Sequence, residues 1–325
     1  MQQSRYVRNE LKYDALVLIS FGGPERPEEV IPFLENVLRG RNVPRERMLE
    51  VAEHYYHLGG RSPINDHCRE LIAALKEQVS LPVYWGNRNW RPMLGDTLRQ
   101  MQADGVKRAL AIATSAYSSY SSCRQYLDDI AGACPEGLVI DKIPPFSSHP
   151  KFIEANTDRV RPVLEKMPQA RLVFTAHSIP LSMASACRYE AELVDAAGRI
   201  SARLGHEEWD LVWQSRSGPP SQPWLEPDIL EHLRALSANG VTDVVVAPIG
   251  FLSDHMEVLY DLDEEAAKLA AELGLNFARA QTVGTHPAII AMLEELVEER
   301  LEADTVVACA ADCCPRPQRV SRPLQ

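Results

Sequence analysis

Residues 172–180 of the chain, LVFTAHSIP, join a short apolar run to a histidine and a proline. An apolar run without alternation is typical of a strand that is buried on both faces of a parallel sheet. Pro180 ends the strand, because proline lacks a backbone N–H and fixes its own φ angle. We therefore expect His177 at the carboxyl end of a buried strand, where the functional sites of open α/β sheets lie.

Apolar runs of the same kind recur along the chain, and helical patterns separate them. The predicted strands are Ala15–Ser20, Pro82–Trp85, Arg108–Thr114, Leu138–Ile140, Leu172–Thr175, Leu211–Gln214 and Val244–Pro248. The predicted helices are Glu28–Leu38, Pro63–Val79, Met93–Ala103, Phe152–Lys166, Tyr189–Leu204, Pro227–Ala238, Leu262–Leu273 and Pro287–Ala303. This alternation predicts parallel sheets with right-handed crossovers.

The strand–helix pattern runs twice, which predicts an α/β protein of two doubly wound, Rossmann-like lobes. The proline-rich segment 144–150 suits a linker between them. We expect an N-terminal lobe over residues 1–147 and a C-terminal lobe over 148–286. Residues 287–325 would form a helix that packs back on the first lobe, followed by a cysteine-rich tail. In such a fold the functional cleft lies between the lobes.

The chain is acidic, with a formal net charge of −11 over 325 residues. This charge disfavours nucleic acid as a partner and suits a metal cation. No stretch approaches the roughly 18 apolar residues that span a bilayer, and no signal-peptide core follows the N-terminus. We expect a cytoplasmic protein without stable membrane insertion.

A second loop at a strand end carries acidic residues. It reads GFLSDHMEVLYD over residues 250–261 and is expected to open a helix. Asp254, Glu257 and Asp261 recur at spacings of three and four, so they would share one helical face. A carboxylate on this face beside His177 would form a site for a divalent metal. The alternative is a charged first turn that the helix dipole favours.

Three further features could bind a flat anionic ligand. Ser62 suits the N-cap of a helix, whose free N–H groups attract a carboxylate, although a plain capped helix has the same pattern. Arg39 closes the first predicted helix and could pair with a carboxylate or simply complement the helix dipole. The loop 213–225, WQSRSGPPSQPWL, could form a stiff aromatic pocket wall or a packed surface loop.

The seven cysteines are not expected to form disulfides in a reducing cytosol. Cys309, Cys313 and Cys314 lie close together near the chain end, and Cys123 lies in a segment leading into a helix. Four thiolates suit a [2Fe–2S] cluster or a structural zinc ion. The alternative is a set of incidental thiols on a frayed tail.

Five segments, in order, resemble the ferrochelatase family over nearly the whole chain. They are SFGGP at 20–24, GGRSP at 59–63, TAHSIP at 175–180, WQS at 213–215 with PWL at 223–225, and SDHMEVLYD at 253–261. The resemblance implies the two-lobed chelatase fold and the insertion of ferrous iron into a porphyrin.

The resemblance also implies roles for individual residues. His177 and Glu257 would face the porphyrin centre, where they would bind the incoming Fe²⁺, take up pyrrole protons, or both. Ser62, Tyr126 and Tyr55 would line the macrocycle pocket. Phe21 falls where some members carry a tyrosine that ligates the product iron.

The chain is most similar to the actinobacterial branch, through Phe21, GNRNW at 86–90 and ATSA at 113–116. That branch is associated with coproporphyrin III as substrate. Some ferrochelatases carry a [2Fe–2S] cluster held by one internal cysteine and three C-terminal ones. Cys123, Cys309, Cys313 and Cys314 fit that count, with Cys134 as an alternative to Cys123.

The expected partners are coproporphyrin III and ferrous iron, and the expected state is a monomer. The stretch Pro24–Glu50 is mixed and charged, so we expect no hydrophobic lip for membrane docking. Protoporphyrin IX is the alternative substrate, and a related chelatase for cobalt or nickel is a further alternative. From another class, the alternative is a non-catalytic haem-binding protein or iron and redox sensor.

Overall fold

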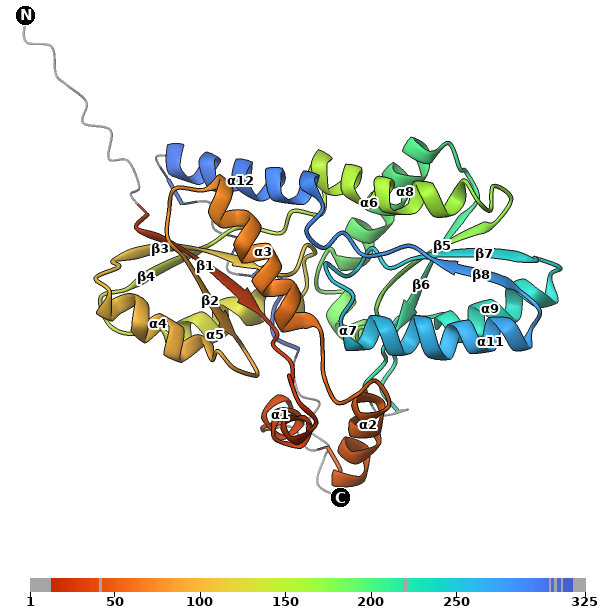
Figure 1. Ribbon diagram of the computed structural model, residues 1–325, viewed down its shortest axis with the longest axis horizontal. Coiled ribbons are helices and arrows are strands. Elements are labelled where there is room, and N and C mark those ends of the chain that lie inside the picture. The colour runs from red at the N-terminus through yellow and green to blue at the C-terminus, as the bar shows by residue number, and fades with distance from the viewer. Residues whose placement is uncertain are drawn as a thin grey trace, which may run out of the picture.

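The structure of the protein is a computed structural model, and it describes residues 13–40, 43–218, 221–303, 305–306, 309–310 and 312–317. Two parallel four-stranded sheets dominate these residues (Figure 1). The first sheet comprises β1 (Ala15–Ser20), β2 (Val83–Asn87), β3 (Arg108–Ala113) and β4 (Val139–Lys142), in the order β2-β1-β3-β4. The second comprises β5 (Arg171–His177), β6 (Trp209–Gln214), β7 (Asp243–Ala247) and β8 (Asn276–Arg279), in the order β6-β5-β7-β8.

The two sheets therefore share one strand order, and the predicted two-lobed α/β class is confirmed. In each lobe the first strand lies second in the sheet and is fully enclosed: every residue of β1 is buried, as are the inner residues of β5. The predicted domain boundaries, after residues 147 and 286, fall between β4 and the helix that follows it and between β8 and the last helix.

Helices cover the two faces of the sheets, as a doubly wound fold requires. One layer, seen above the sheets in Figure 1, contains α6 (Pro150–Leu164), α8 (Tyr189–Leu204) and α12 (Pro287–Glu302). The remaining covering helices are α3 (Ile64–Gln78), α4 (Leu94–Ala103), α5 (Gln125–Ala133), α9 (Ile229–Ala238) and α11 (Ala267–Glu272). Helix α12 contacts α3 of the first lobe and α6 of the second.

One hydrophobic core runs through both lobes. It includes Leu18 of β1, Phe152 of α6, Phe174 of β5 and Met292 of α12, each at most 1% exposed. Because these residues form one connected cluster, the lobes share buried apolar surface and are not two independently packed units.

A small helical unit lies apart from both sheets, at the bottom of Figure 1. It consists of the 3₁₀ turn η1 (Pro27–Glu29), α1 (Val30–Val37) and α2 (Arg45–His57). Phe33, Met48 and Ala52 belong to its own core. Sequence analysis missed α2, because only Met48 and Ala52 of its thirteen residues are buried and the apolar period is therefore weak.

Three other elements differ from the prediction. The edge strand β8 was missed because its sequence, NFAR, is not an apolar run. The short α7 (Leu181–Ala184) follows Pro180 directly. The helix predicted at 262–273 begins earlier, with α10 (Met256–Val258), and continues through the π-helix η3 (Leu259–Ala266) into α11. A second π-helix, η2 (Tyr120–Arg124), precedes α5.

Across the described ranges, no helix combines the length and the hydrophobicity needed to cross a bilayer.

Candidate active site

His177 is the last residue of β5, at the carboxyl end of the second sheet, as the sequence predicts. Its Nδ1 atom lies 2.5 Å from the backbone oxygen of Ser178. A carbonyl oxygen only accepts, so Nδ1 carries the proton and Nε2 of the neutral ring carries the free lone pair. The buried Tyr189 hydroxyl donates to the His177 backbone oxygen at 3.0 Å, which fixes the strand end from the other side.

Glu257 faces this lone pair from α10. Its Oε2 atom lies 3.9 Å from Nε2 of His177, and the two side chains are 50% and 31% exposed. This distance is too long for a hydrogen bond, so the pair leaves a gap that a ligand could bridge. His255 caps α10, because its Nδ1 accepts from the Glu257 backbone N–H at 3.2 Å. From the sequence, Ser253 or Asp254 would be the expected cap, because serine and aspartate are common cap residues, but the cap lies one or two residues later.

Gly250 brings the two strand ends together. A Cβ atom at this position would lie 2.4 Å from Cβ of Ala176, the neighbour of His177. The Gly250 N–H donates to the Thr175 backbone oxygen at 3.0 Å. Only glycine permits this approach, which positions the loop carrying Glu257 against the strand carrying His177.

Asp261 lies beneath the pair, in the π-helix η3. It accepts from Nε2 of Gln214 at 3.2 Å and from the hydroxyl of Ser215. Burial raises the pKa of Asp261 to about 7, and the Glu257 carboxylate raises it further, against the lowering effect of the Ser215 bond. This carboxyl can therefore hold or release a proton near neutral pH.

Asp254 does not share a helical face with the other two carboxylates, contrary to the prediction. It precedes α10 and pairs with Arg279 at 2.8 Å, and it accepts from the Thr282 N–H at 3.3 Å. Asp254 thus anchors the loop to β8, and only Glu257 and Asp261 belong to the site.

Tyr55 approaches the same site from α2. Burial raises the pKa of its hydroxyl, and the nearby Glu257 carboxylate raises it further. Two contacts hold α2 against η3: the His54 and Tyr260 rings stack at 3.9 Å and 9°, and Nε2 of His57 lies 3.4 Å from Oε2 of Glu264. The small helical unit therefore closes one side of the site.

The sequence profile of the ferrochelatase family matches residues 13–301. The chain belongs to the ferrochelatase family. Its relatives include a protein of Rhodopirellula baltica named ferrochelatase, which is 50% identical over 96% of this chain and 98% of its own. Two proteins named coproporphyrin III ferrochelatase are also similar. The one from Nocardia farcinica is 48% identical over 94% of this chain and 97% of its own, and the one from Mycolicibacterium smegmatis is 49% identical over 90% and 91%.

Solved structures of chelatases share the fold. SirB from Bacillus subtilis, solved with Fe³⁺, aligns with a TM-score of 0.60 at 13% identity, over 89% of this chain and 96% of that one. CbiX, described as the terminal enzyme of sirohaem biosynthesis in denitrifying bacteria, aligns with a TM-score of 0.50 at 16% identity, over 88% and 98%. At these identities the likeness concerns the fold alone.

Four further residues that the sequence analysis selected lie in the first lobe or in the small helical unit. Phe21 is 38% exposed and packs edge-on against Phe33, at 6.3 Å between ring centroids. Tyr126 is only 4% exposed, beneath the Arg88 guanidinium, which lies 4.6 Å from its ring centroid. Ser62 is 3% exposed at the start of α3, and Arg39 is exposed at the end of α1, bonded to Asn36.

The two tryptophans of the loop 213–225 do not present open faces. Trp213 is 3% exposed and packs on Tyr189, and Trp224 is 8% exposed. A Cβ atom at Gly218 would lie 2.4 Å from the Trp224 ring, so the loop folds onto its own aromatic side chain. Of the two interpretations of this loop, the packed one agrees with the described part of it.

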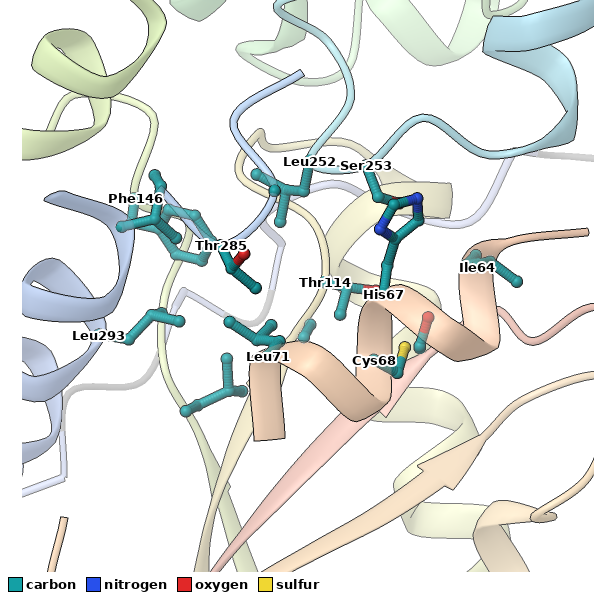
Figure 2. Close-up of a pocket in the computed structure, with 15 residues that line it drawn as sticks. Ile64, His67, Cys68, Leu71, Thr114, Phe146, Leu252, Ser253, Thr285 and Leu293 are labelled. Atoms are coloured by element: carbon teal, nitrogen blue, oxygen red, sulfur yellow. The ribbon is translucent and has the colours of Figure 1, made fainter. Parts of the chain in front are cut away.

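A cavity of about 40 Å³ lies between the lobes, behind the loop that carries Glu257 (Figure 2). Helix α3 contributes His67 and Cys68, and the loop contributes Leu252 and Ser253. Most of the lining is apolar, and the space is enough for a few water molecules. Burial raises the pKa of Cys68 to about 11, so this residue stays a neutral thiol.

The cysteines selected from the sequence converge. The Sγ atoms of Cys313 and Cys314 lie 3.3 Å apart. Burial raises the pKa of Cys309, and the nearby Cys123 and Cys313 thiolates raise it further. Burial likewise raises the pKa of Cys314, with contributions from Cys313 and Cys123. Cys123 thus influences both Cys309 and Cys314, although Cys123 and Cys309 lie 186 positions apart in the chain.

Cys134 lies elsewhere. Its thiol donates to the Leu138 backbone oxygen at 3.2 Å, and burial alone raises its pKa. Within the described part of the chain, no three His, Cys, Asp or Glu side chains already stand in an arrangement suited to a single metal ion.

Proposed function

We propose that this chain inserts ferrous iron into coproporphyrin III, giving iron coproporphyrin III and two protons. The carrying observation is the free Nε2 lone pair of His177, held opposite the Glu257 carboxylate at 3.9 Å. The relatives named coproporphyrin III ferrochelatase, at 48% and 49% identity over nine-tenths or more of this chain, support the choice of porphyrin.

Metal insertion requires the removal of two pyrrole protons and the exchange of water on the iron for nitrogen. His177 takes the first proton at Nε2, because its Nδ1–H is committed to the Ser178 carbonyl. Glu257 is half-exposed beside His177, so it binds the incoming Fe²⁺ and releases it to the ring nitrogens. Asp261, whose pKa is near 7 and which interacts with Glu257, takes up protons that leave the site.

Porphyrin nitrogens present their lone pairs to iron only when the ring bends out of plane. Contacts at the periphery of the ring can supply the energy of this distortion. We assign the periphery to Phe21, Ser62, Tyr55, Tyr126 and Arg39. Ser62 and Tyr126 are buried in the present arrangement, so neighbouring side chains must move before either reaches the ring, the Arg88 guanidinium in the case of Tyr126.

The number of propionates favours coproporphyrin over protoporphyrin IX. Coproporphyrin carries four propionates and is the more soluble of the two. The small helical unit exposes Arg39, Arg45 and Arg47 beside the apolar side chains of Leu49 and Tyr56. Arginine pairs readily with carboxylates, so this surface suits the tetra-anionic ring. The acidic, water-compatible surface also fits our proposal of a cytoplasmic monomer.

The test is an anaerobic assay with ferrous iron, in which coproporphyrin III and protoporphyrin IX are offered separately. We expect rapid formation of iron coproporphyrin and slow or no metallation of protoporphyrin IX. Equal turnover of both rings would remove the substrate assignment. Tight binding of both rings without metallation would replace catalysis with the sensor function.

We propose, separately, that Cys123, Cys309, Cys313 and Cys314 hold a [2Fe–2S] cluster. The support is the 3.3 Å distance between the Sγ atoms of Cys313 and Cys314, together with the contribution of Cys123 to the raised pKa of Cys309 and of Cys314. Such a cluster supplies an electron-transfer or redox-sensitive centre, and here it would also fasten the tail to the first lobe. A structural zinc ion is the alternative. The visible spectrum and the iron, sulfide and zinc contents of the pure protein decide between them.

A further inference from the structure

Two neighbouring residues of the first lobe, Tyr117 and Ser118, bond directly to the second lobe across the seam between the lobes. Both lie between β3 and η2. The Tyr117 hydroxyl donates to the Ile249 backbone oxygen at 3.1 Å. The Ser118 N–H and hydroxyl both donate to the Glu192 carboxylate, each at 2.7 Å. These bonds hold the segment firmly against the second lobe.

The contact between Ser118 and Glu192 is a rigid joint. The backbone N–H of Ser118 donates to Oε2 of Glu192, and the hydroxyl donates to Oε1. Both carboxylate oxygens are thus engaged by one residue of the opposite lobe. Hydrogen bonds to an ionised acceptor are about twice as strong as those between neutral groups. Glu192 therefore fixes its own helix, α8, to the first lobe.

The first turn of α8 connects this joint to the active site. Glu192 lies three residues after Tyr189, so the two side chains share one side of the helix. Tyr189 is 4% exposed, and its hydroxyl donates to the backbone oxygen of His177 at 3.0 Å. Its ring packs edge-on against Tyr117, with 6.1 Å between the ring centroids. One helical turn is therefore bonded to the first lobe and to the end of β5.

The bond from Tyr189 bears on the orientation of the His177 ring. The His177 oxygen and the Ser178 N–H belong to one planar peptide group. Tyr189 holds the oxygen of this group, and the Gln214 backbone oxygen accepts from its N–H at 2.8 Å. The next carbonyl, that of Ser178, lies 2.5 Å from Nδ1 of His177. The orientation of this peptide thus determines whether Nε2 keeps the free lone pair.

We propose that Glu192 is a positioning residue for iron insertion. Bound to Ser118, it lets the first lobe hold Tyr189, and thereby His177, in the arrangement that takes up a proton. The lobe to which we assign most contacts with the periphery of the porphyrin is then mechanically coupled to the proton acceptor in the other lobe. This inference rests on the proposed function, because it requires Nε2 of His177 to take a pyrrole proton.

Four variants test the inference. Glu192→Ala removes the joint, and Tyr189→Phe removes its link to His177. Glu192→Gln is the conservative variant, because its amide oxygen can accept from the Ser118 N–H and its amide N–H can donate to the hydroxyl oxygen. Glu190→Ala is the matched control, since Glu190 is an exposed carboxylate in the same turn of α8.

The first readout is the tautomer of His177 in protein without porphyrin. The proteins carry ¹⁵N-labelled histidine, and the His177 signals are those that His177→Ala loses. We expect the wild type to show a protonated Nδ1 and a bare Nε2. Glu192→Ala and Tyr189→Phe should shift both nitrogens towards a mixture of tautomers, because the ring is released from the Ser178 carbonyl.

The second readout is single-turnover metallation of coproporphyrin III beside porphyrin titration. Glu192→Ala and Tyr189→Phe should each lower the metallation rate roughly tenfold and leave the Kd for the porphyrin unchanged. Glu192→Gln should restore both the rate and the tautomer, and Glu190→Ala should match the wild type.

A purely structural role for Glu192 gives a different result. Glu192→Ala would then melt at a lower temperature, while its folded fraction kept the wild-type His177 signals and metallation rate, and this would overturn the inference. Should Glu192→Ala not fold, Ser118→Ala removes only the hydroxyl bond, and unchanged signals and rate would count equally against the inference. Full metallation by a folded His177→Ala variant would instead remove the proposed role of His177, whatever the tautomer measurement shows for Glu192.

Discussion

At the scale of single residues, the site depends on which nitrogen of His177 carries the proton. The Ser178 carbonyl settles this by accepting from Nδ1, and the Tyr189 hydroxyl steadies the same strand end. Replacing His177 with alanine removes the proton acceptor and leaves the surrounding backbone bonds intact. We expect His177→Ala to lower kcat by about 10²–10⁴-fold while the Kd for porphyrin hardly changes.

The measurement is single-turnover metallation beside porphyrin titration by fluorescence. A suitable control is His206→Ala, because His206 lies on the turn after α8, outside the site, and its buried Nε2 has no hydrogen-bond partner. Full activity of a folded His177→Ala variant would refute the assignment.

Asp261 gives a prediction for stability against pH. Its folded-state pKa is about 7, well above the ordinary value of 3.8. The unfolded chain therefore releases this proton first, and the folded protein loses stability as the pH rises from about 4 to about 7. Asp261→Asn removes this loss, so the variant should gain about 4 kcal/mol relative to the wild type at pH 8, compared with pH 4. Urea unfolding at a series of pH values measures the difference, and parallel curves for the two proteins would contradict it.

Some residues of the site could be selected from the sequence, and others could not. His177 and Glu257 were found because each follows an apolar strand, and strand ends mark α/β sites. Sequence analysis did not distinguish Asp261 from the two other carboxylates at helical spacing. Its environment depends on Gln214 and Ser215, which come from another strand and loop.

At the scale of elements, α2 and η3 form a contact that closes the site. Stacking between His54 and Tyr260 is worth about 0.5–1.5 kcal/mol beyond the buried area. If the closed arrangement binds the porphyrin, His54→Ala and Tyr260→Ala should each weaken porphyrin binding by about 2–10-fold. The double variant should be little worse than either single one, because both remove the same contact.

Porphyrin titration of the four proteins completes this double-mutant cycle. Tyr56→Ala, which changes an exposed ring on the same helix, should bind as the wild type does. Strictly additive losses for His54→Ala and Tyr260→Ala would show that the two rings do not act together.

The elements that sequence analysis missed have a common physical cause. Helix α2 buries two residues, and β8 lies at a sheet edge with none of its residues buried. Periodicity reports burial, so elements that bury little leave little signal. The other seven strands, by contrast, were found within two residues at each end. The helix predicted to begin at residue 262 in fact begins at Met256. This start gave no clear signal because His255 caps it, and histidine is not among the usual cap residues.

At the scale of the whole molecule, the connected core predicts that the two lobes unfold together. Leu18 and Phe174 belong to one cluster, and the buried Tyr117 hydroxyl donates to the Ile249 backbone oxygen across the seam at 3.1 Å. We expect a single transition in urea or heat. Tryptophan fluorescence reports each lobe separately, if either Trp85 and Trp90 or the second-lobe set Trp209, Trp213 and Trp224 are replaced by phenylalanine.

Coincident midpoints for the two sets of probes are the expected result. Two separated transitions would mean that the lobes are independent domains. Tyr117→Phe offers a finer check, because it leaves the Ile249 carbonyl buried without its partner and should cost about 1–2 kcal/mol.

Because the two sheets share one strand order, each has an equivalent corner at the carboxyl ends of its first two strands. In the first sheet the last paired residues of β1 and β2 are Ser20 and Asn87, and in the second sheet those of β5 and β6 are His177 and Gln214. The same corner of the fold thus occurs twice, as a serine with an asparagine and as a histidine with a glutamine. At this corner the second sheet carries the histidine of the proposed site, and the first sheet carries a serine. Ser20→His tests whether the first sheet accepts a histidine at the position equivalent to that of His177.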